Sequence, residues 1–144
     1  MITSGEFSTI TKSESETRAV AKQLSQTLQP GDIVLLIGDL GAGKTAFVKG
    51  FVEGLGLSDD VVSPTFTILN IYGEGVVNHY DLYRLDSSVE FENTGAHESL
   101  YLGGISLIEW PERVGLDYFP ESAWRVEIQK ISDSERKIIV TRNI

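Results

Sequence analysis

One stretch of this sequence carries a specific signature: Gly38-Asp39-Leu40-Gly41-Ala42-Gly43-Lys44-Thr45. It fits G-x-x-x-x-G-K-[ST], the phosphate-binding loop of nucleoside triphosphatases. We expect its glycines to adopt backbone angles closed to other residues, and its N–H groups to face phosphate at the positive end of a helix dipole. Lys44 should then contact the β- and γ-phosphates, and the hydroxyl of Thr45 should bind Mg²⁺. The nucleotide-binding residues expected in the loop are Asp39, Leu40, Gly41, Ala42, Gly43, Lys44 and Thr45.

The segments on either side of the loop agree with this pattern. Residues 32–37 form an apolar, β-branched run that is typical of a buried parallel strand. Residues 44–55 have apolar side chains at helical spacing, and Gly54 and Gly56 mark the end of the predicted helix. A glycine-rich turn without a ligand is the alternative, and the flanking strand and helix count against it.

The composition limits the class of protein. With 144 residues, 41% of them hydrophobic, the chain is expected to form one domain with a packed core over residues 1–144. It has no apolar run of about 18 residues and no basic stretch followed by an apolar one, so we expect neither a membrane span nor a signal peptide. Disulfides and thiolate metal sites are excluded because there is no cysteine. We expect a soluble, cytoplasmic protein.

The chain is acidic, with a formal net charge of −9. Broad contact with the phosphate backbone of a nucleic acid needs a basic surface, so direct binding of DNA or RNA is disfavoured. The charge is compatible with a role beside RNA in a complex with basic partners, or with solubility alone.

The segment before the loop predicts an edge strand followed by a helix. Residues 7–11 alternate in polarity, as in a short edge strand. Ser13 and Glu16 then form a capping box, which predicts a helix as far as about Gln29.

The segment after the loop predicts further strands and a hairpin. Residues 66–72 and 76–82 are strand-like runs separated by two glycines, which predicts an antiparallel hairpin. One or two short helices are expected within residues 86–100. Other strands are predicted at residues 105–108, 124–128 and 137–141. The fold predicted is therefore α/β: a single P-loop NTPase-like domain with a mixed parallel and antiparallel sheet of about seven strands and flanking helices.

Glu109 is the candidate carboxylate for Mg²⁺. This hard cation prefers oxygen ligands, and in P-loop enzymes a carboxylate usually ends a strand beside the loop strand. Glu109 directly follows the apolar run 105–108. A surface glutamate at a strand end is the alternative interpretation.

Asp81 is the second acidic candidate, because it could order the attacking water or a metal-bound water. Its alternatives are an ion pair with Arg84 and a strand-end cap. Alternation along the strand places His79, Asp81, Tyr83 and Leu85 on one face. We expect His79 to be a structural histidine.

Thr65 lies next to Pro64, which bars a regular central strand at that point. Its hydroxyl could contact the γ-phosphate, or it could be a simple turn hydroxyl.

Four pieces of the sequence together resemble one family. They are residues 38–45, Ser63-Pro64-Thr65-Phe66-Thr67, His79-Tyr80-Asp81-Leu82-Tyr83-Arg84-Leu85 and Ile108-Glu109-Trp110-Pro111. In order and spacing, over residues 13–128, the chain resembles TsaE, the P-loop ATPase family of bacterial tRNA N6-threonylcarbamoyladenosine biosynthesis. The loop alone would indicate a superfamily, whereas the other three pieces are specific to this family.

The resemblance implies a small mixed α/β sheet with helices on both faces and weak hydrolysis of ATP to ADP with Mg²⁺. It also implies the TsaD and TsaB proteins as partners, which modify the adenosine next to the anticodon in tRNAs reading codons that begin with A. In that system the ATP cycle keeps TsaD turning over, and tRNA is reached only through the complex. No membrane and no direct DNA contact are implied.

Carried over residue by residue, the resemblance implies that Lys44 holds phosphate and that Thr45 and Glu109 hold Mg²⁺. Asp81 and Thr65 would lie near the γ-phosphate, so the implied catalytic residues are Asp81, Glu109, Thr65 and Lys44.

Around these residues, Trp110 would flank the site. Adenine contacts in the family come from the start of the first helix and from a late hairpin, here within residues 11–13 and 134–136. The residues implied are Thr11, Ser13 and Arg136.

The chain departs from the family before Gly95, where relatives tend to carry apolar residues and this sequence has Asn93 and Thr94. Among alternative functions, a small-molecule kinase usually needs an arginine-bearing lid, and the sequence shows no arginine-rich insert. A GTP-dependent binding switch would be expected to carry Asn-Lys-x-Asp, which is absent. A nucleotide-binding structural subunit is the third alternative.

Overall fold

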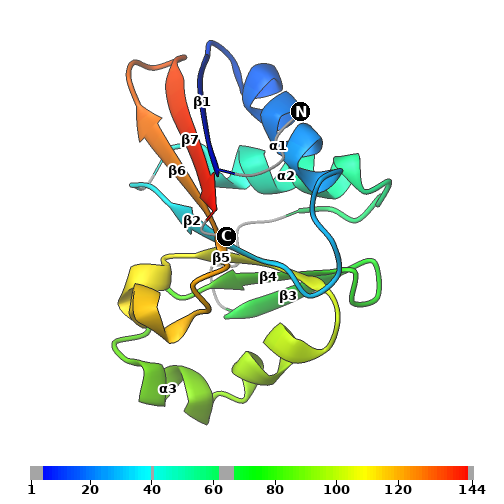
Figure 1. The fold of residues 1–144 in the computed structure, drawn as a ribbon, viewed down its shortest axis with the longest axis vertical. Helices are drawn as coiled ribbons and strands as arrows, with labels where there is room; N and C mark the ends of the chain where they lie inside the picture. Colours follow the sequence, from blue (N-terminus) through cyan, green and yellow to red (C-terminus); the bar gives the residue numbers. More distant parts are fainter. Residues whose placement is uncertain (1–4, 40, 62–66, 143–144) are drawn as a thin grey trace.

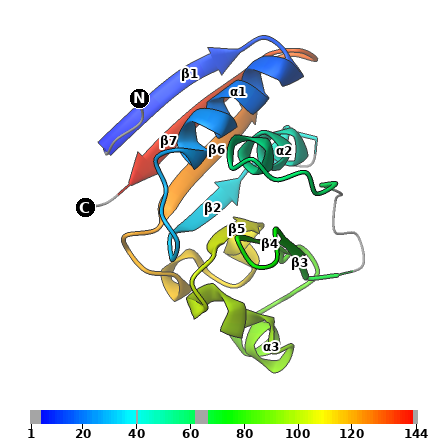
Figure 2. The same cartoon turned by 90° about the vertical axis from the view of Figure 1, so that its right-hand side faces the viewer.

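The computed structural model describes residues 5–39, 41–61 and 67–142, which contain a seven-stranded sheet with helices on both faces (Figures 1 and 2). The strands are β1 (Gly5–Thr11), β2 (Ile33–Ile37), β3 (Leu69–Tyr72), β4 (Val77–Asp81), β5 (Ile105–Glu109), β6 (Trp124–Lys130) and β7 (Arg136–Arg142). The α-helices are α1 (Glu14–Ser25), α2 (Lys44–Gly54) and α3 (Ser88–Asn93). Short 3₁₀ helices are η1 (Ala96–Tyr101), η2 (Pro111–Arg113) and η3 (Leu116–Tyr118).

The sheet is mixed, as predicted, and its order is β1-β7-β6-β2-β5-β4-β3. Its centre is parallel, because β2 pairs with β5 and β6, and β4 pairs with β5. Both margins are antiparallel through β1 with β7, β6 with β7, and β3 with β4. The glycine hairpin of the sequence is thus the β3–β4 pair, and the phosphate loop leaves from the central strand.

The two faces of β2 belong to two separate cores. Val34 and Leu36 pack in a cluster with α1 and α2, while Ile33 and Leu35 pack in a cluster with α3 and η1. All four side chains are buried. A strand buried on both faces requires the continuous apolar run that the sequence shows.

Helices α1 and α2 pack unusually close together, with their axes crossing at an angle (Figures 1 and 2). A Cβ on Gly50 would lie 2.6 Å from the Cα of Arg18, and one on Gly54 would lie 3.0 Å from the Cα of Lys22. Real Cβ atoms essentially never lie within 3.0 Å of a backbone atom, so glycine is required at position 50, and a Cβ at position 54 would lie closer still to the Ser25 hydroxyl oxygen. The N-termini of the two helices border one cavity, which is lined by Ser13 and Glu14 on the side of α1 and by Gly43 and Ala46 on the side of α2.

Several helix and strand boundaries differ from the prediction, among them the ends of α1 and β4. Helix α1 ends at Ser25 rather than near Gln29, because the Ser25 hydroxyl donates to the Lys22 carbonyl and Thr27 N–H bonds to the Leu24 carbonyl three residues back. Strand β4 ends at Asp81, after which the chain turns.

The predicted placement of Leu85 on the face of His79 is therefore wrong. Leu85 N–H donates to the Leu82 carbonyl in that turn, and Leu85 packs with Tyr80 and Leu82 in the α3 cluster.

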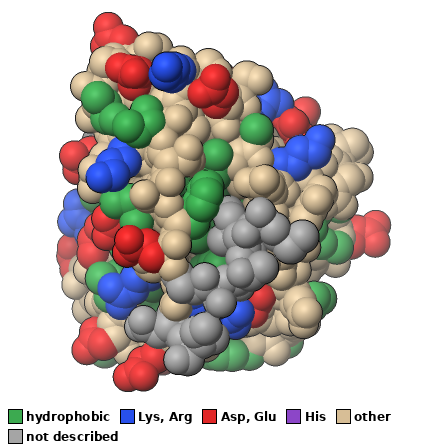
Figure 3. Space-filling model, turned by 45° about the horizontal axis from the view of Figure 1, so that its top comes forward, with side chains coloured by type: hydrophobic (Ala, Val, Ile, Leu, Met, Phe, Trp, Pro, Cys, Tyr) green, Lys and Arg blue, Asp and Glu red, His purple; other side chains and the backbone are tan. Residues whose placement is uncertain are grey.

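Charged side chains are interspersed on the face shown in Figure 3, where Lys and Arg do not gather into a basic patch. Within the described residues, no helix combines the length and the apolar character that crossing a membrane requires.

Candidate functional site

The phosphate loop connects the end of β2 to the start of α2. Gly41 and Gly43 have φ values of +77° and +107°, a region that favours glycine, as the sequence predicts. Gly38 is required for a different reason, since a Cβ there would lie 2.7 Å from the Ile128 carbonyl oxygen of β6. Leu40 lies outside the described residues.

Lys44 is the first residue of α2 and is buried. Its Nζ donates to the Gly38 carbonyl at 2.7 Å and lies 3.9 Å from the centre of the Trp110 ring. Burial lowers the pKa of Lys44, and the nearby carboxylates of Glu109 and Asp81 oppose that shift. The ammonium group is therefore held in the mouth of the loop, among acidic side chains.

A cavity of about 290 Å³ brings together six of the predicted site residues. It is lined by Gly41, Gly43, Lys44, Thr45, Asp81, Glu109 and Trp110. The sheet register explains why they meet: Glu109 pairs with Asp81 of β4 on one side and with Leu36 of β2 on the other. Since these parallel strands end at one edge, their last carboxylates face the loop that follows β2.

Glu109 is buried and receives a hydrogen bond from a histidine. Nε2 of His79 lies 2.6 Å from Oε2 of Glu109, and Nδ1 of His79 lies 3.2 Å from the hydroxyl of Tyr72. A carboxylate accepts, so we assign the proton to Nε2, which leaves Nδ1 to accept from Tyr72. A chain of side chains thus runs from β3 through β4 to β5 and fixes the orientation of Glu109.

Sequence analysis missed this role of His79. The register of β4 and β5 explains the contact. His79 pairs with Leu107, and Glu109 lies two residues further along β5 on the same face of the sheet. Finding it requires knowledge that β4 and β5 are neighbours.

Asp81 closes β4 by accepting from the N–H of Tyr83 at 3.0 Å, which is the strand-end cap that the sequence allowed. It also lines the cavity, so capping the strand does not remove the carboxylate from the site. Burial raises the pKa of Asp81, and the neighbouring Glu109 carboxylate adds to the rise.

Trp110 forms the outer wall of the cavity. Its φ is +59°, which is uncommon for a residue other than glycine. Its ring centre lies 5.0 Å from that of Tyr83, and the guanidinium of Arg113 lies 4.7 Å from the Tyr83 ring. The unusual backbone therefore presents the indole to Lys44 with aromatic support behind it.

The described residues include no group of three or more His, Asp or Glu side chains placed to hold a metal ion. Thr45 and Glu109 nevertheless provide a hydroxyl and a carboxylate on one cavity, and these hard oxygen donors suit Mg²⁺. Mg²⁺ is usually bound by few protein ligands together with nucleotide phosphates, so this donor set fits the ion.

A second cavity, of about 310 Å³, lies between the N-termini of α1 and α2 and the β6–β7 turn. It is lined by Ser13, Glu14, Thr17, Gly43, Ala46, Asp133, Ser134 and Arg136. Two predicted base contacts, Ser13 and Arg136, are thus brought together from opposite ends of the chain. Thr11 is not among the lining residues, and its buried hydroxyl lies 2.8 Å from that of Thr17.

Of the other predicted residues, Asp39 is exposed and its carbonyl accepts from the N–H of Ala42 at 3.0 Å. Thr65 lies outside the described residues.

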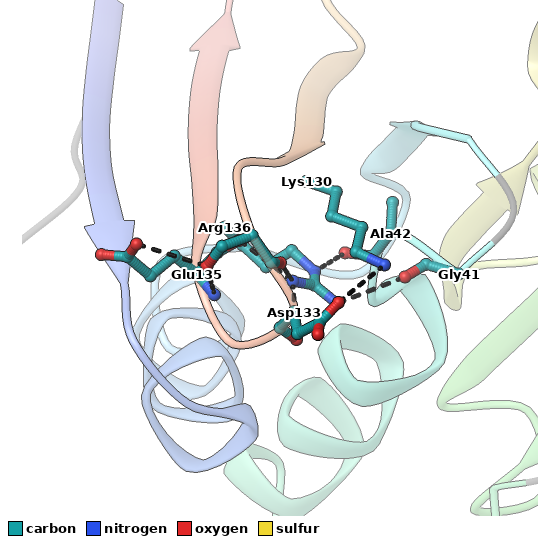
Figure 4. Close-up of polar contacts among 7 residues, drawn as sticks. Gly41, Ala42, Lys130, Asp133, Glu135 and Arg136 are labelled. Atoms are coloured by element: carbon teal, nitrogen blue, oxygen red, sulfur yellow. Dashed lines mark hydrogen bonds and ion pairs between the residues drawn. The ribbon is translucent and has the colours of Figure 1, made fainter.

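Arg136 connects the second cavity to the phosphate loop. Its Nε donates to the Ala42 carbonyl at 2.8 Å, and its Nη1 donates to carbonyls of the β6–β7 turn (Figure 4).

Comparison with known proteins agrees with this geometry. The family model described as threonylcarbamoyl adenosine biosynthesis protein TsaE matches residues 11–138. The tRNA threonylcarbamoyladenosine biosynthesis protein TsaE of Bacillus subtilis is 42% identical over 128 residues, which cover 88% of this chain and 79% of that protein. The protein of the same name from Treponema pallidum is 39% identical over 132 residues, covering 91% and 97%.

The crystal structure of Bacillus subtilis YdiB is similar in fold, with a TM-score of 0.78 at 36% identity. The match covers 95% of this chain and 85% of that one. The family model spans most of the chain, and the mixed sheet is the one that the resemblance implied. The chain belongs to the TsaE family.

Proposed function

We propose that this protein binds ATP with Mg²⁺ and hydrolyses it weakly, as the ATPase of the machinery that forms threonylcarbamoyladenosine in tRNA. The observation that carries the proposal is that Gly43 lines both cavities. One nucleotide could therefore lie across the loop, with its phosphates beside Lys44 and its base beside Ser13.

Each residue of the phosphate cavity has a role in this proposal. Lys44 would leave the Gly38 carbonyl to contact the β- and γ-phosphates, and the uncapped N–H groups at the start of α2 would bind their oxygens. Thr45 and Glu109 would hold Mg²⁺, which neutralises charge on the phosphate oxygens when bound.

The remaining residues would prepare the reaction. Asp81 would accept a hydrogen bond from the attacking water and orient it. His79 fixes the Glu109 carboxylate, and Trp110 shields the cavity from bulk water. After hydrolysis, ADP would remain held by the loop and the base cavity.

We further propose TsaD and TsaB as protein partners and a cytoplasmic site of action, with the ATP cycle supporting turnover of the TsaD–TsaB transferase. The names of the relatives support the pathway. The net charge of −9 supports contact with tRNA through the complex rather than directly.

Steady-state ATP hydrolysis, measured alone and with the cognate TsaD and TsaB proteins, tests the proposal. We expect a low rate that the partners raise, and loss of both rates in Lys44→Ala. Hydrolysis that the partners leave unchanged would overturn the assigned pathway role, and no binding of ATP would overturn the whole proposal.

A further inference from the structure

We infer that Arg136 positions the phosphate loop: its guanidinium fixes the Ala42–Gly43 peptide so that the Gly43 N–H is aimed at the phosphates. This inference rests on the proposed function and deepens it. The resemblance implies only an adenine contact for Arg136, whereas the geometry assigns it to the loop itself.

The hydrogen bonds of Arg136 go to backbone carbonyls on two separate segments. Towards the loop, Nε donates to the Ala42 carbonyl at 2.8 Å, and Nη2 lies 3.4 Å from the Gly41 carbonyl. Towards the β6–β7 turn, Nη1 lies 2.7 Å from the Ser132 carbonyl and 3.0 Å from that of Glu135. Figure 4 shows the side chain reaching from β7 between these two segments.

A planar trans peptide has its C=O and N–H on opposite sides. Because Arg136 holds the Ala42 carbonyl on the side of the β6–β7 turn, the N–H of Gly43 in the same peptide points away from the guanidinium. Gly43 borders the phosphate cavity and precedes α2 with φ at +107°. One amide donor of the loop is therefore oriented, through the Ala42 carbonyl, by a side chain 94 residues beyond Ala42 in the sequence.

The charge of Arg136 also favours an anion nearby. Among the described residues no carboxylate forms an ion pair with it, and the adjacent Asp133 carboxylate lies 3.7 Å from Nζ of Lys130 instead (Figure 4). The loop thus gains a cation that carbonyl dipoles hold in place without neutralising it.

Lysine cannot replace this arginine. A guanidinium presents N–H groups in several fixed directions, whereas an ammonium group is a single point. Arg136→Lys would keep the charge and the aliphatic stem but could not join the turn and the loop at once. Arg142→Lys is the matched control, because Arg142 lies at the other end of β7 and its Nε also donates to a backbone carbonyl, that of Ser122.

The first measurement uses the free protein and depends on no ligand. In ¹H–¹⁵N spectra, Arg136→Lys should displace the amide resonances of Ala42 and Gly43, while those of β3 and β4 stay in place and Arg142→Lys leaves all of them unchanged. Unmoved Ala42 and Gly43 resonances in Arg136→Lys would overturn the inference, whatever the protein binds.

The second measurement distinguishes a role of Arg136 in the phosphate loop from a direct contact with the base. Calorimetry with Mg²⁺ and either ATP or inorganic tripolyphosphate, which has no base, should show at least tenfold weaker binding of both to Arg136→Lys. Weaker binding of ATP alone would make Arg136 a base contact and overturn the inference. A wild-type protein that binds neither would instead refute the proposed function, and the amide resonances would still decide the role of Arg136.

Discussion

Replacing His79 by leucine should release the buried carboxylate of Glu109. The His79 side chain is fully buried, and its Nε2 lies 2.6 Å from Oε2 of Glu109, which is itself only 5% exposed. Leucine fills much of the same space but has no N–H. Glutamine is the matched variant, because its side-chain amide can place an N–H close to where Nε2 lies.

The expected loss of stability follows from the kind of hydrogen bond that is removed. A hydrogen bond to a charged group contributes about 1.5–3 kcal/mol, and burial of both partners places this one in the upper part of that range. We expect His79→Leu to lower the free energy of unfolding by about 2.5 kcal/mol, or Tm by roughly 8–10 °C, and His79→Gln to lower it by about 1 kcal/mol or less.

Urea unfolding with linear extrapolation measures this difference. In the same variants, the Mg²⁺ concentration that gives half-maximal ATP hydrolysis should rise about tenfold for leucine and much less for glutamine, because partners that orient a metal ligand affect metal affinity on that scale. If both variants lost the same stability and the same Mg²⁺ affinity, the shape of the histidine would matter rather than its N–H, and the reasoning would be refuted.

Four further substitutions test other parts of the site and fold. Lys44→Ala should weaken ATP binding by about 3 kcal/mol, or roughly 100-fold, in calorimetry; near-normal affinity would contradict the phosphate role. Glu109→Ala should reduce ATP hydrolysis more than ADP binding, because Mg²⁺ matters most when the γ-phosphate is present; equal losses would argue against a metal ligand. Asp81→Asn should slow hydrolysis yet raise Tm at neutral pH, since burial raises the pKa of Asp81 and so penalises its ionised form above that raised value. The gain should fade as the pH falls to the ordinary value of 3.8, and a gain independent of pH would refute this account. Gly50→Ala should destabilise the fold by about 1–2 kcal/mol in urea unfolding, because the overpacking against the Arg18 backbone outweighs the better helix propensity of alanine; a stabilised variant would contradict the close helix packing.

Local sequence patterns were sufficient to predict much of this structure. The loop motif, the apolar run of β2 and the capping box of Ser13 are short-range signals, and the loop, β2 and the start of α1 lie where they were predicted. Glu109 was predicted as a site residue because a carboxylate at the end of an apolar run is also a local signal. Its place beside Asp81 then follows from the parallel register of β4 and β5.

Other features depend on contacts between distant segments. The bond between His79 and Glu109 requires the neighbouring placement of β4 and β5, which no local pattern indicates. The position of Leu85 depends on where β4 ends. If the alternation of the strand is continued past Asp81, Leu85 is assigned to the wrong face of the sheet. Arg136 reaches backbone carbonyls, which carry no sequence signal at all.

The close packing of α1 and α2 would give a nucleotide bound as proposed a direction. Both helix N-termini border the same region, but α1 opens with Glu14 and Glu16, and Ser13 already accepts a hydrogen bond from the Glu16 N–H, so α1 disfavours an anion. Helix α2 opens with Gly43 and Lys44, has no side-chain cap and carries no acid in its first turn. Of two equal helix dipoles side by side, only one is left open to an anion. Under the proposed function, a nucleotide entering this edge would therefore seat its phosphates at α2 alone, with its base turned towards α1 before any base-specific contact forms.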